Sequence, residues 1–345
     1  MIPSLPLGPL MADVAGIALT PEDRQRLIHP LVGGVILFSR NYRDPEQLAA
    51  LCRDIHGLRQ PALLISIDHE GGRVQRCREG FTRLPPMAAL GRHWDRNPGE
   101  ALASAEALGY VLASELRAVG VDFSYAPVLD LNFGRSSVIG DRSLHRNPQA
   151  VTDLARALIR GMGAAGMANC GKHFPGHGWV AADSHVSIPV DERSLAEMGE
   201  DMAPYQALVQ DGSLKAVMPA HVTYPAMDGH PAGFSPYWIN KLRRELGFTG
   251  VIFSDDLSMA GAGVVGGIQQ RAQAAWDAGC DVLLVCNQPE AVDELLGAWR
   301  VEVPEDKIQR LMGLQPKGEA LSREQLKQEA RYEEGVAWAE RLGQE

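Results

Sequence analysis

The sequence predicts an α/β protein, a single TIM-type (β/α)8 barrel, regular or irregular, with additional helices at its C-terminus. Three observations lead to this expectation. Short apolar runs recur eight times, amphipathic stretches separate them, and charged residues follow several of the runs. Apolar runs without alternation are typical of parallel strands covered on both faces. Eight of them with intervening helices indicate a barrel, which normally takes about 250 residues.

The expected strands are the apolar runs at residues 10–17, 34–38, 63–68, 121–126, 167–172, 216–221, 251–254 and 281–285. The expected helices include residues 45–58, 100–118, 150–165, 195–210 and 269–278. Two helix starts carry recognisable caps. Thr20 precedes Pro21 and stands three positions before Asp23, and Asp44 precedes Pro45. An N-cap side chain followed by proline at the first helical position favours a helix start at both places.

No low-complexity linker interrupts the chain, so we expect residues 1–345 to form one catalytic barrel domain. Residues 287–345 are charged and helical in pattern, and we expect them to form an extension packed on the barrel. Ser322 is expected to cap a helix over residues 323–342.

The composition is that of a globular protein, 45% hydrophobic and 22% charged. A net charge of −10 argues against nucleic acid or an anionic membrane surface as a partner. The five cysteines are an odd set without a CxxC pair, which favours a reducing compartment. We expect no signal peptide, because the first residues lack a basic region and contain several prolines. No apolar run approaches the roughly 20 residues that span a bilayer, so a cytoplasmic location is expected.

Charged residues gather at the carboxyl ends of five predicted strands, where barrel enzymes build their active sites. These ends carry Asp68 to Arg76, Asp141 and Arg142, Lys172 and His173, His221, and Asp255 and Asp256. The densest of these segments is 169–185, which presents Lys172 and His173 and closes on Asp183-Ser184-His185. A loop rich in glycine, proline and titratable groups is typical of a catalytic loop on a rigid scaffold.

Asp255 and the Asp183–His185 pair are the candidates for chemistry. A carboxylate such as Asp255 at a strand end can attack an anomeric carbon, although either Asp255 or Asp256 could instead cap a helix starting at Leu257. The carboxylate of Asp183 can orient His185 as an acid/base. The alternative for this pair is a loop that only hydrogen-bonds to itself.

Asp68, Arg76, Arg142 and Lys172 are suited to holding a polyhydroxylated ligand, since charged groups form strong hydrogen bonds to hydroxyls. The same residues could instead form a structural salt-bridge network. No metal site is expected, because Pro175 and Gly176 prevent the helix that would bring His173 and His177 together. Other readings are a Schiff-base aldolase using Lys172, a metal-dependent hydrolase, and a barrel that binds sugar without catalysis.

Three segments together resemble family 3 glycoside hydrolases, and more narrowly the bacterial NagZ-type β-N-acetylhexosaminidases. They are Ile-Asp-His-Glu-Gly-Gly-Arg-Val-Gln-Arg, ending at Arg76; Lys-His-Phe-Pro-Gly-His-Gly with the later Asp-Ser-His; and Val-Ile-Phe-Ser-Asp-Asp-Leu-Ser-Met, around Asp255. The segments occur in the family's order, and the resemblance extends from about residue 8 to residue 287.

The resemblance implies a retaining hydrolase that works through a covalent glycosyl-enzyme. It makes Asp255 the nucleophile, His185 the acid/base and Asp183 its dyad partner, and it assigns sugar binding to Asp68, Arg76, Arg142, Lys172 and His173. The implied substrate is terminal β-linked N-acetylglucosamine on anhydromuramyl-peptides in cytoplasmic cell-wall recycling. No cofactor or metal is implied, and we expect a monomer that binds this small saccharide.

Two features depart from the family pattern. His69 stands where glutamine is frequent, and the loop 132–137 has no clear counterpart. The chain has no room for the second α/β domain of many larger relatives, which favours the NagZ type over a β-glucosidase type. No residue visibly binds an acetamido group, so the β-glucosidase alternative stays open at this point.

Overall fold

The computed structural model describes residues 3–181 and 189–344. Within this part, each predicted apolar run contains or overlaps one parallel strand, and the prediction of an α/β fold with eight such strands is confirmed. The strands are β1 (Leu10–Ala12), β2 (Val32–Leu37), β3 (Leu64–Ile67), β6 (Phe123–Ser124), β7 (Cys170–Phe174), β8 (Ala216–Pro219), β11 (Val251–Ile252) and β12 (Leu283–Val285). Most strands are shorter than the runs that predicted them.

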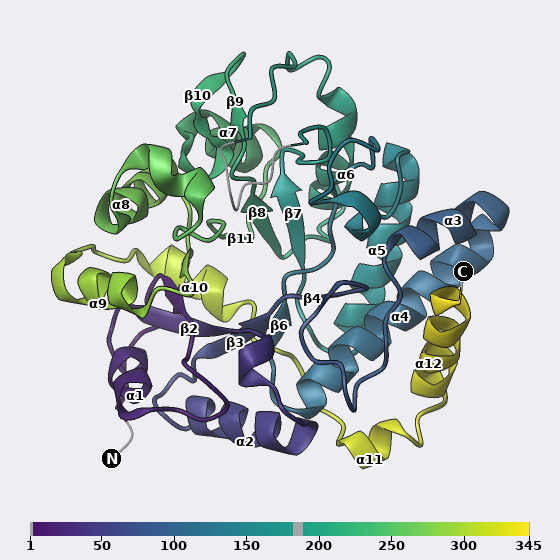
Figure 1. Cartoon of the computed structure of the whole chain (residues 1–345), viewed down its shortest axis with the longest axis horizontal. Helices are drawn as coiled ribbons and strands as arrows, with labels where there is room; N and C mark the ends of the chain where they lie inside the picture. Colours follow the sequence, from purple (N-terminus) through teal and green to yellow (C-terminus); the bar gives the residue numbers. More distant parts are fainter. Residues whose placement is uncertain (1–2, 182–188, 345) are drawn as a thin grey trace.

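The strands form two parallel sheets, ordered β12-β1-β2-β3-β6 and β11-β8-β7. Figure 1 labels β2, β3 and β6 of the first sheet and β7, β8 and β11 of the second. An isolated bridge between Phe123 and Ala168 joins β6 to the start of β7, and one between Phe253 and Val282 joins β11 to β12. The eight strands therefore follow one another in the order of a TIM-type barrel. Single bridges replace continuous ladders at these two junctions, which makes the barrel irregular.

The helices between the strands are α1 (Pro21–Leu27), α2 (Pro45–His56), α3 (Ala88–Arg96), α4 (Pro98–Ala118), α5 (Pro148–Ala164), α6 (Gly199–Gln210), α7 (Pro236–Asn240) and α8 (Ile268–Ala278). Both predicted caps are present. The Thr20 side chain accepts from the backbone N–H of Asp23 within a capping box, and Asp44 accepts from that of Gln47. The expected helix over 195–210 begins only at Gly199, after a turn.

The C-terminal segment contains α9 (Pro289–Ala298), α10 (Glu305–Met312), α11 (Arg323–Leu326) and α12 (Ala330–Gly343). The prediction of one helix over 323–342 is wrong, because the chain breaks between α11 and α12. Ser322 does cap α11. Helix α12, yellow in Figure 1, packs against α4. This contact is close at Gly335, where a Cβ would lie 2.4 Å from Cγ2 of Val111.

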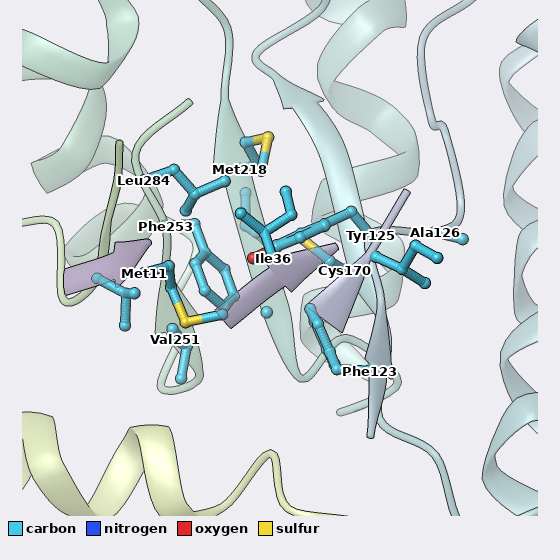
Figure 2. Packing of buried hydrophobic residues seen from close by; sticks show 14 of the residues in the cluster. Met11, Ile36, Phe123, Tyr125, Ala126, Cys170, Met218, Val251, Phe253 and Leu284 are labelled. Carbon is cyan, nitrogen blue, oxygen red and sulfur yellow. The ribbon is translucent and has the colours of Figure 1, made fainter. Parts of the chain in front are cut away.

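Apolar side chains fill the barrel interior, as Figure 2 shows. The rings of Phe123, Tyr125 and Phe253 meet with centroids 5.2–5.7 Å apart. The Tyr125 hydroxyl lies 3.0 Å from Oγ of Ser66, so its polar end is paired inside the core. Toward the carboxyl ends of the strands, this core ends in a layer that forms the floor of a cavity: Ile36, Tyr125, Met218 and Leu284.

Asp281 holds the opposite end of the barrel together. Its buried carboxylate accepts a hydrogen bond from the backbone N–H of Ile252, at 2.8 Å. It also pairs with Nη2 of Arg310, at 2.9 Å, and with the Arg243 guanidinium. One side chain therefore connects β11, the start of β12 and α10.

Replacing Asp281 with alanine is expected to lower the free energy of unfolding by about 3 kcal/mol, because it leaves a buried N–H and two cations without their acceptor. Urea-induced unfolding measures the change. Asp306→Ala is a matched control, since it removes an exposed carboxylate from the same Arg310. That variant should stay within about 0.5 kcal/mol of the unchanged protein. Equal losses in the two variants would contradict this account.

Candidate active site

A cavity of about 310 Å³ opens at the carboxyl ends of the strands. Six of the eight site residues predicted from the sequence line it, and they lie in or after four different barrel strands, β3, β6, β7 and β11. These are Asp68, Arg76, Arg142, Lys172, His173 and Asp255. The other two, Asp183 and His185, lie outside the described residues. The fold thus brings together residues that are far apart in the chain.

Lys172, in the middle of β7, pairs with two carboxylates. Its Nζ lies 2.9 Å from Oδ1 of Asp68 and 2.7 Å from Oε1 of Glu70. Glu70 belongs to β4 (His69–Gly71), which pairs with β5 (Val74–Gln75) in a short hairpin directly after β3. The Glu70 carboxylate also accepts two hydrogen bonds from Arg142, one from Nε at 2.9 Å and one from Nη2 at 2.8 Å. The predicted ligand-binding cations are therefore held in place by a shared carboxylate.

The charges in this network reinforce one another. Burial alone would raise the pKa of Glu70, but the charges of Arg142 and Lys172 bring it far below its usual value. Burial likewise opposes ionisation of Asp68, and Lys172 and Arg76 hold the pKa of that carboxyl below its usual range. For Lys172, burial lowers the pKa and the carboxylates of Asp68 and Glu70 more than offset this, so the pKa is raised. All these groups are ionised near neutral pH.

His173 is oriented by Asp130, a fully buried residue from the segment after β6. Nδ1 of His173 lies 2.7 Å from Oδ2 of Asp130. Burial raises the pKa of Asp130, but His173 and His177 outweigh it and keep the pKa below its usual value. Because the carboxylate is ionised and can only accept, Nδ1 of His173 carries a proton and donates it.

Asp255 and Asp256 follow β11 and have different surroundings. Asp255 lines the cavity, and its Oδ1 accepts from the backbone N–H of Asp256 at 2.8 Å. The Asp256 carboxylate accepts from the N–H and hydroxyl of Ser258 and from the N–H of Cys286, near the end of β12. Burial raises the pKa of Asp256 to about 6. No helix begins at Leu257; after a turn, the chain enters the 3-10 segment η5 (Ala260–Val265). The alternative that Asp255 or Asp256 caps a helix at Leu257 is therefore wrong.

Sequence reasoning missed Glu70 and Asp130, although both lie within four residues of a predicted strand end. No local signal marks their roles, because both pair with side chains from distant parts of the chain. The alternatives of ligand binding and salt-bridge formation are not exclusive, since the network of Asp68, Glu70, Arg142 and Lys172 also lines the cavity.

Within residues 3–181 and 189–344, no group of three or more His, Cys, Asp and Glu side chains is arranged to hold a metal ion. All five cysteines are unpaired and buried. None of the helices in the described ranges combines the length and apolarity needed to cross a bilayer.

Comparisons with known proteins find relatives that match most of the chain. Residues 10–331 match the glycosyl hydrolase family 3 N-terminal domain. A β-hexosaminidase of Thiobacillus denitrificans is 58% identical over 342 residues, covering 98% of this chain and 95% of that protein. The crystal structure of native NagZ from Neisseria gonorrhoeae is 47% identical and covers 99% of this chain and 100% of its own, with a TM-score of 0.94. A family 3 β-N-acetylglucosaminidase from Paenibacillus is 32% identical, with a TM-score of 0.82, over 97% of this chain and 66% of its own.

Proposed function

The chain belongs to glycosyl hydrolase family 3, among the bacterial β-hexosaminidases, and from this membership we propose that it removes terminal β-linked N-acetylglucosamine with retention of configuration. One observation carries the proposal. Asp255 lines the same 310 Å³ cavity as the charged network around Lys172, so a nucleophile and a sugar-binding wall face one space. A cavity of this size suits one sugar ring with part of its leaving group.

In the proposed mechanism, the Asp255 carboxylate attacks the anomeric carbon as the glycosidic bond breaks, and a covalent glycosyl-enzyme forms. His185, oriented by Asp183, gives a proton to the departing oxygen. The same imidazole then takes a proton from the water that hydrolyses the intermediate. These two roles rest on the family motif, because both residues lie outside the described part of the chain.

The sugar would be held by Asp68, Arg76, Arg142, Lys172 and His173. The carboxylate of Asp68 accepts from hydroxyls, whereas Lys172 and Arg142 donate to them, and hydrogen bonds to charged groups are about twice as strong as neutral ones. The ion pairs among these side chains support the proposal, because they fix the donors before the substrate arrives.

We further propose that the substrates are N-acetylglucosaminyl-anhydromuramyl-peptides released during cell-wall recycling, and that a monomer acts on them in the cytoplasm. The similarity to NagZ over 99% of the chain supports this substrate class. Five unpaired, buried cysteines are compatible with a reducing compartment. No cofactor enters the proposed reaction, since carboxylates and imidazole suffice for both steps.

The direct test compares an aryl β-N-acetylglucosaminide with the matching aryl β-glucoside. We expect kcat/KM to be at least about 100-fold higher for the N-acetylated substrate, because a site that binds the acetamido group loses that contact with glucose. A preference for the glucoside would favour the β-glucosidase alternative. Product analysis early in the reaction should show the β-anomer, as retention requires.

The aldolase alternative conflicts with the surroundings of Lys172. Schiff-base formation needs an uncharged amine, but two carboxylates within 2.9 Å raise the pKa of this lysine. Borohydride reduction in the presence of a carbonyl substrate should therefore leave the protein unlabelled.

Replacing Glu70 with glutamine is expected to lower kcat/KM by about 10–100-fold, because charge-assisted hydrogen bonds to both Lys172 and Arg142 are lost. The pKa of Lys172 should also fall, since one of the two carboxylates that raise it is gone. NMR titration of the Lys172 side chain measures this fall in pKa.

The control for Glu70 is Glu115, a buried glutamate that accepts from Thr82 and Tyr332 and lines no part of the cavity. Glu115→Gln should leave both kcat/KM and the pKa of Lys172 unchanged. An unchanged Lys172 pKa in Glu70→Gln would show that Glu70 does not raise it.

A further inference from the structure

His177 has a buried imidazole whose two nitrogens form no hydrogen bond with the described part of the chain. The residue is 2% exposed, and neither ring nitrogen has a hydrogen-bond partner among the described residues. The ring nevertheless lines the cavity that contains Asp255, with its centroid 5.9 Å from that of His173. We propose that His177 is a further substrate-binding residue, whose imidazole makes a polar contact with the sugar in this cavity.

The backbone around His177 is fixed independently of its ring. The His177 N–H donates to Oδ1 of Asp130 at 2.7 Å. On one side, the Gly176 carbonyl accepts from the Tyr224 hydroxyl at 2.8 Å. On the other side, a Cβ at Gly178 would lie 1.9 Å from the carbonyl oxygen of Leu131, so only glycine allows this close approach. The segment is therefore held in place by contacts that do not require the imidazole to face the cavity.

The ring is uncharged in these surroundings. Burial lowers the pKa of His177, and the neighbouring His173 lowers it further, against the opposing charges of Asp130 and Asp255. A neutral imidazole has one donor and one acceptor. Sugar hydroxyls and the amide of an N-acetyl group offer the complementary acceptor and donor. The site already contains charged binding groups, so His177 adds a neutral partner for one of these functions.

Unpaired buried polar groups are uncommon in proteins, because leaving water without gaining a partner costs free energy. Among residues 3–181 and 189–344, neither ring nitrogen of His177 has a partner, and the ring lies on the cavity wall. His69 is also buried, and its Nδ1 has no partner among the described residues. It differs from His177 because it lies on β4 and does not line the cavity. The position of His177 on the wall is therefore what indicates a ligand.

The experiment uses His177→Phe, which keeps a planar ring and removes both nitrogens, and His177→Gln, which keeps a donor and an acceptor. His69→Phe is the matched control for replacing a buried histidine. The measurements are kcat/KM for an aryl β-N-acetylglucosaminide and the Kd of free N-acetylglucosamine by calorimetry. We expect His177→Phe to lower kcat/KM by about 10–100-fold and to weaken binding of the monosaccharide. His177→Gln should recover part of the loss, and His69→Phe should stay within about threefold of the unchanged protein.

The inference rests on the proposed function, and the two can fail separately. If the unchanged protein cleaves the substrate but His177→Phe does so equally well, His177 does not bind the sugar and only this inference fails. Equal losses in His177→Phe and His69→Phe would also overturn it, because a general packing defect would then explain both. If the unchanged protein neither cleaves the substrate nor binds the monosaccharide, the proposed function fails as well.

The same variants identify the group that His177 contacts. A loss restricted to the N-acetylated substrate would assign the contact to the acetamido group. An equal loss on the matching aryl β-glucoside would assign it to a hydroxyl that both sugars share. Either outcome supports a contact between His177 and the sugar.

Discussion

Replacing Asp255 with alanine is expected to lower kcat by about 10⁴-fold or more for every substrate, whatever its leaving group. The reason is that Asp255 supplies the bond-forming oxygen in the first step and is the group released in the second. Steady-state kinetics with an activated aryl β-N-acetylglucosaminide measure the loss. Substantial residual activity would mean that another group is the nucleophile.

Azide can separate loss of the nucleophile from general damage to Asp255→Ala. In this variant, a small anion can enter the space left by the carboxylate and attack the anomeric carbon while the aryl group leaves. We expect azide to restore part of the turnover and to yield a glycosyl azide of α configuration, inverted relative to the β-glycoside. Binding of free N-acetylglucosamine should persist, since the network around Lys172 is intact. A β-azide product would contradict direct displacement at this site.

Replacing His185 with alanine is expected to have a large effect that depends on the leaving group. Loss of a general acid typically costs about 10²–10⁴-fold when the departing oxygen needs a proton. An activated aryl group such as dinitrophenolate leaves without one, so its release should be much less affected. A plot of log kcat/KM against the pKa of the leaving group should therefore become steeper in the variant.

Asp183→Ala should change the same slope in the same direction, because it removes the carboxylate proposed to orient the imidazole of His185. Equal losses on activated and unactivated substrates would argue against an acid role for His185. In that case the residue would be required for binding or folding instead.

Much of the fold could be predicted because it depends on local pattern. Continuous apolar runs such as 216–221 contain or overlap the eight strands, and the caps at Thr20 and Asp44 mark true helix starts. Element ends were predicted less well. The break between α11 and α12 and the late start of α6 were missed, because a charged surface helix has little apolar pattern to mark its limits.

In the candidate site, too, some residues could be predicted from the sequence and others could not. Asp68, Lys172 and Asp255 could be placed at one end of the barrel because parallel strands deliver their carboxyl ends to the same side. The roles of Glu70 and Asp130 could not be foreseen. Each acts through burial and through partner side chains from other parts of the chain, which no local pattern contains.

Local patterns were thus sufficient for the strand order, for the helix caps and for which end of the barrel carries the charged residues. Only the tertiary structure determines which of these charged side chains pair with one another. Lys172 meets Asp68 across 104 positions, and Arg142 meets Glu70 across 72. The physical reason is that a pKa and a hydrogen-bond partner depend on burial and on distances in space. Both arise only after the strands have assembled around the cavity.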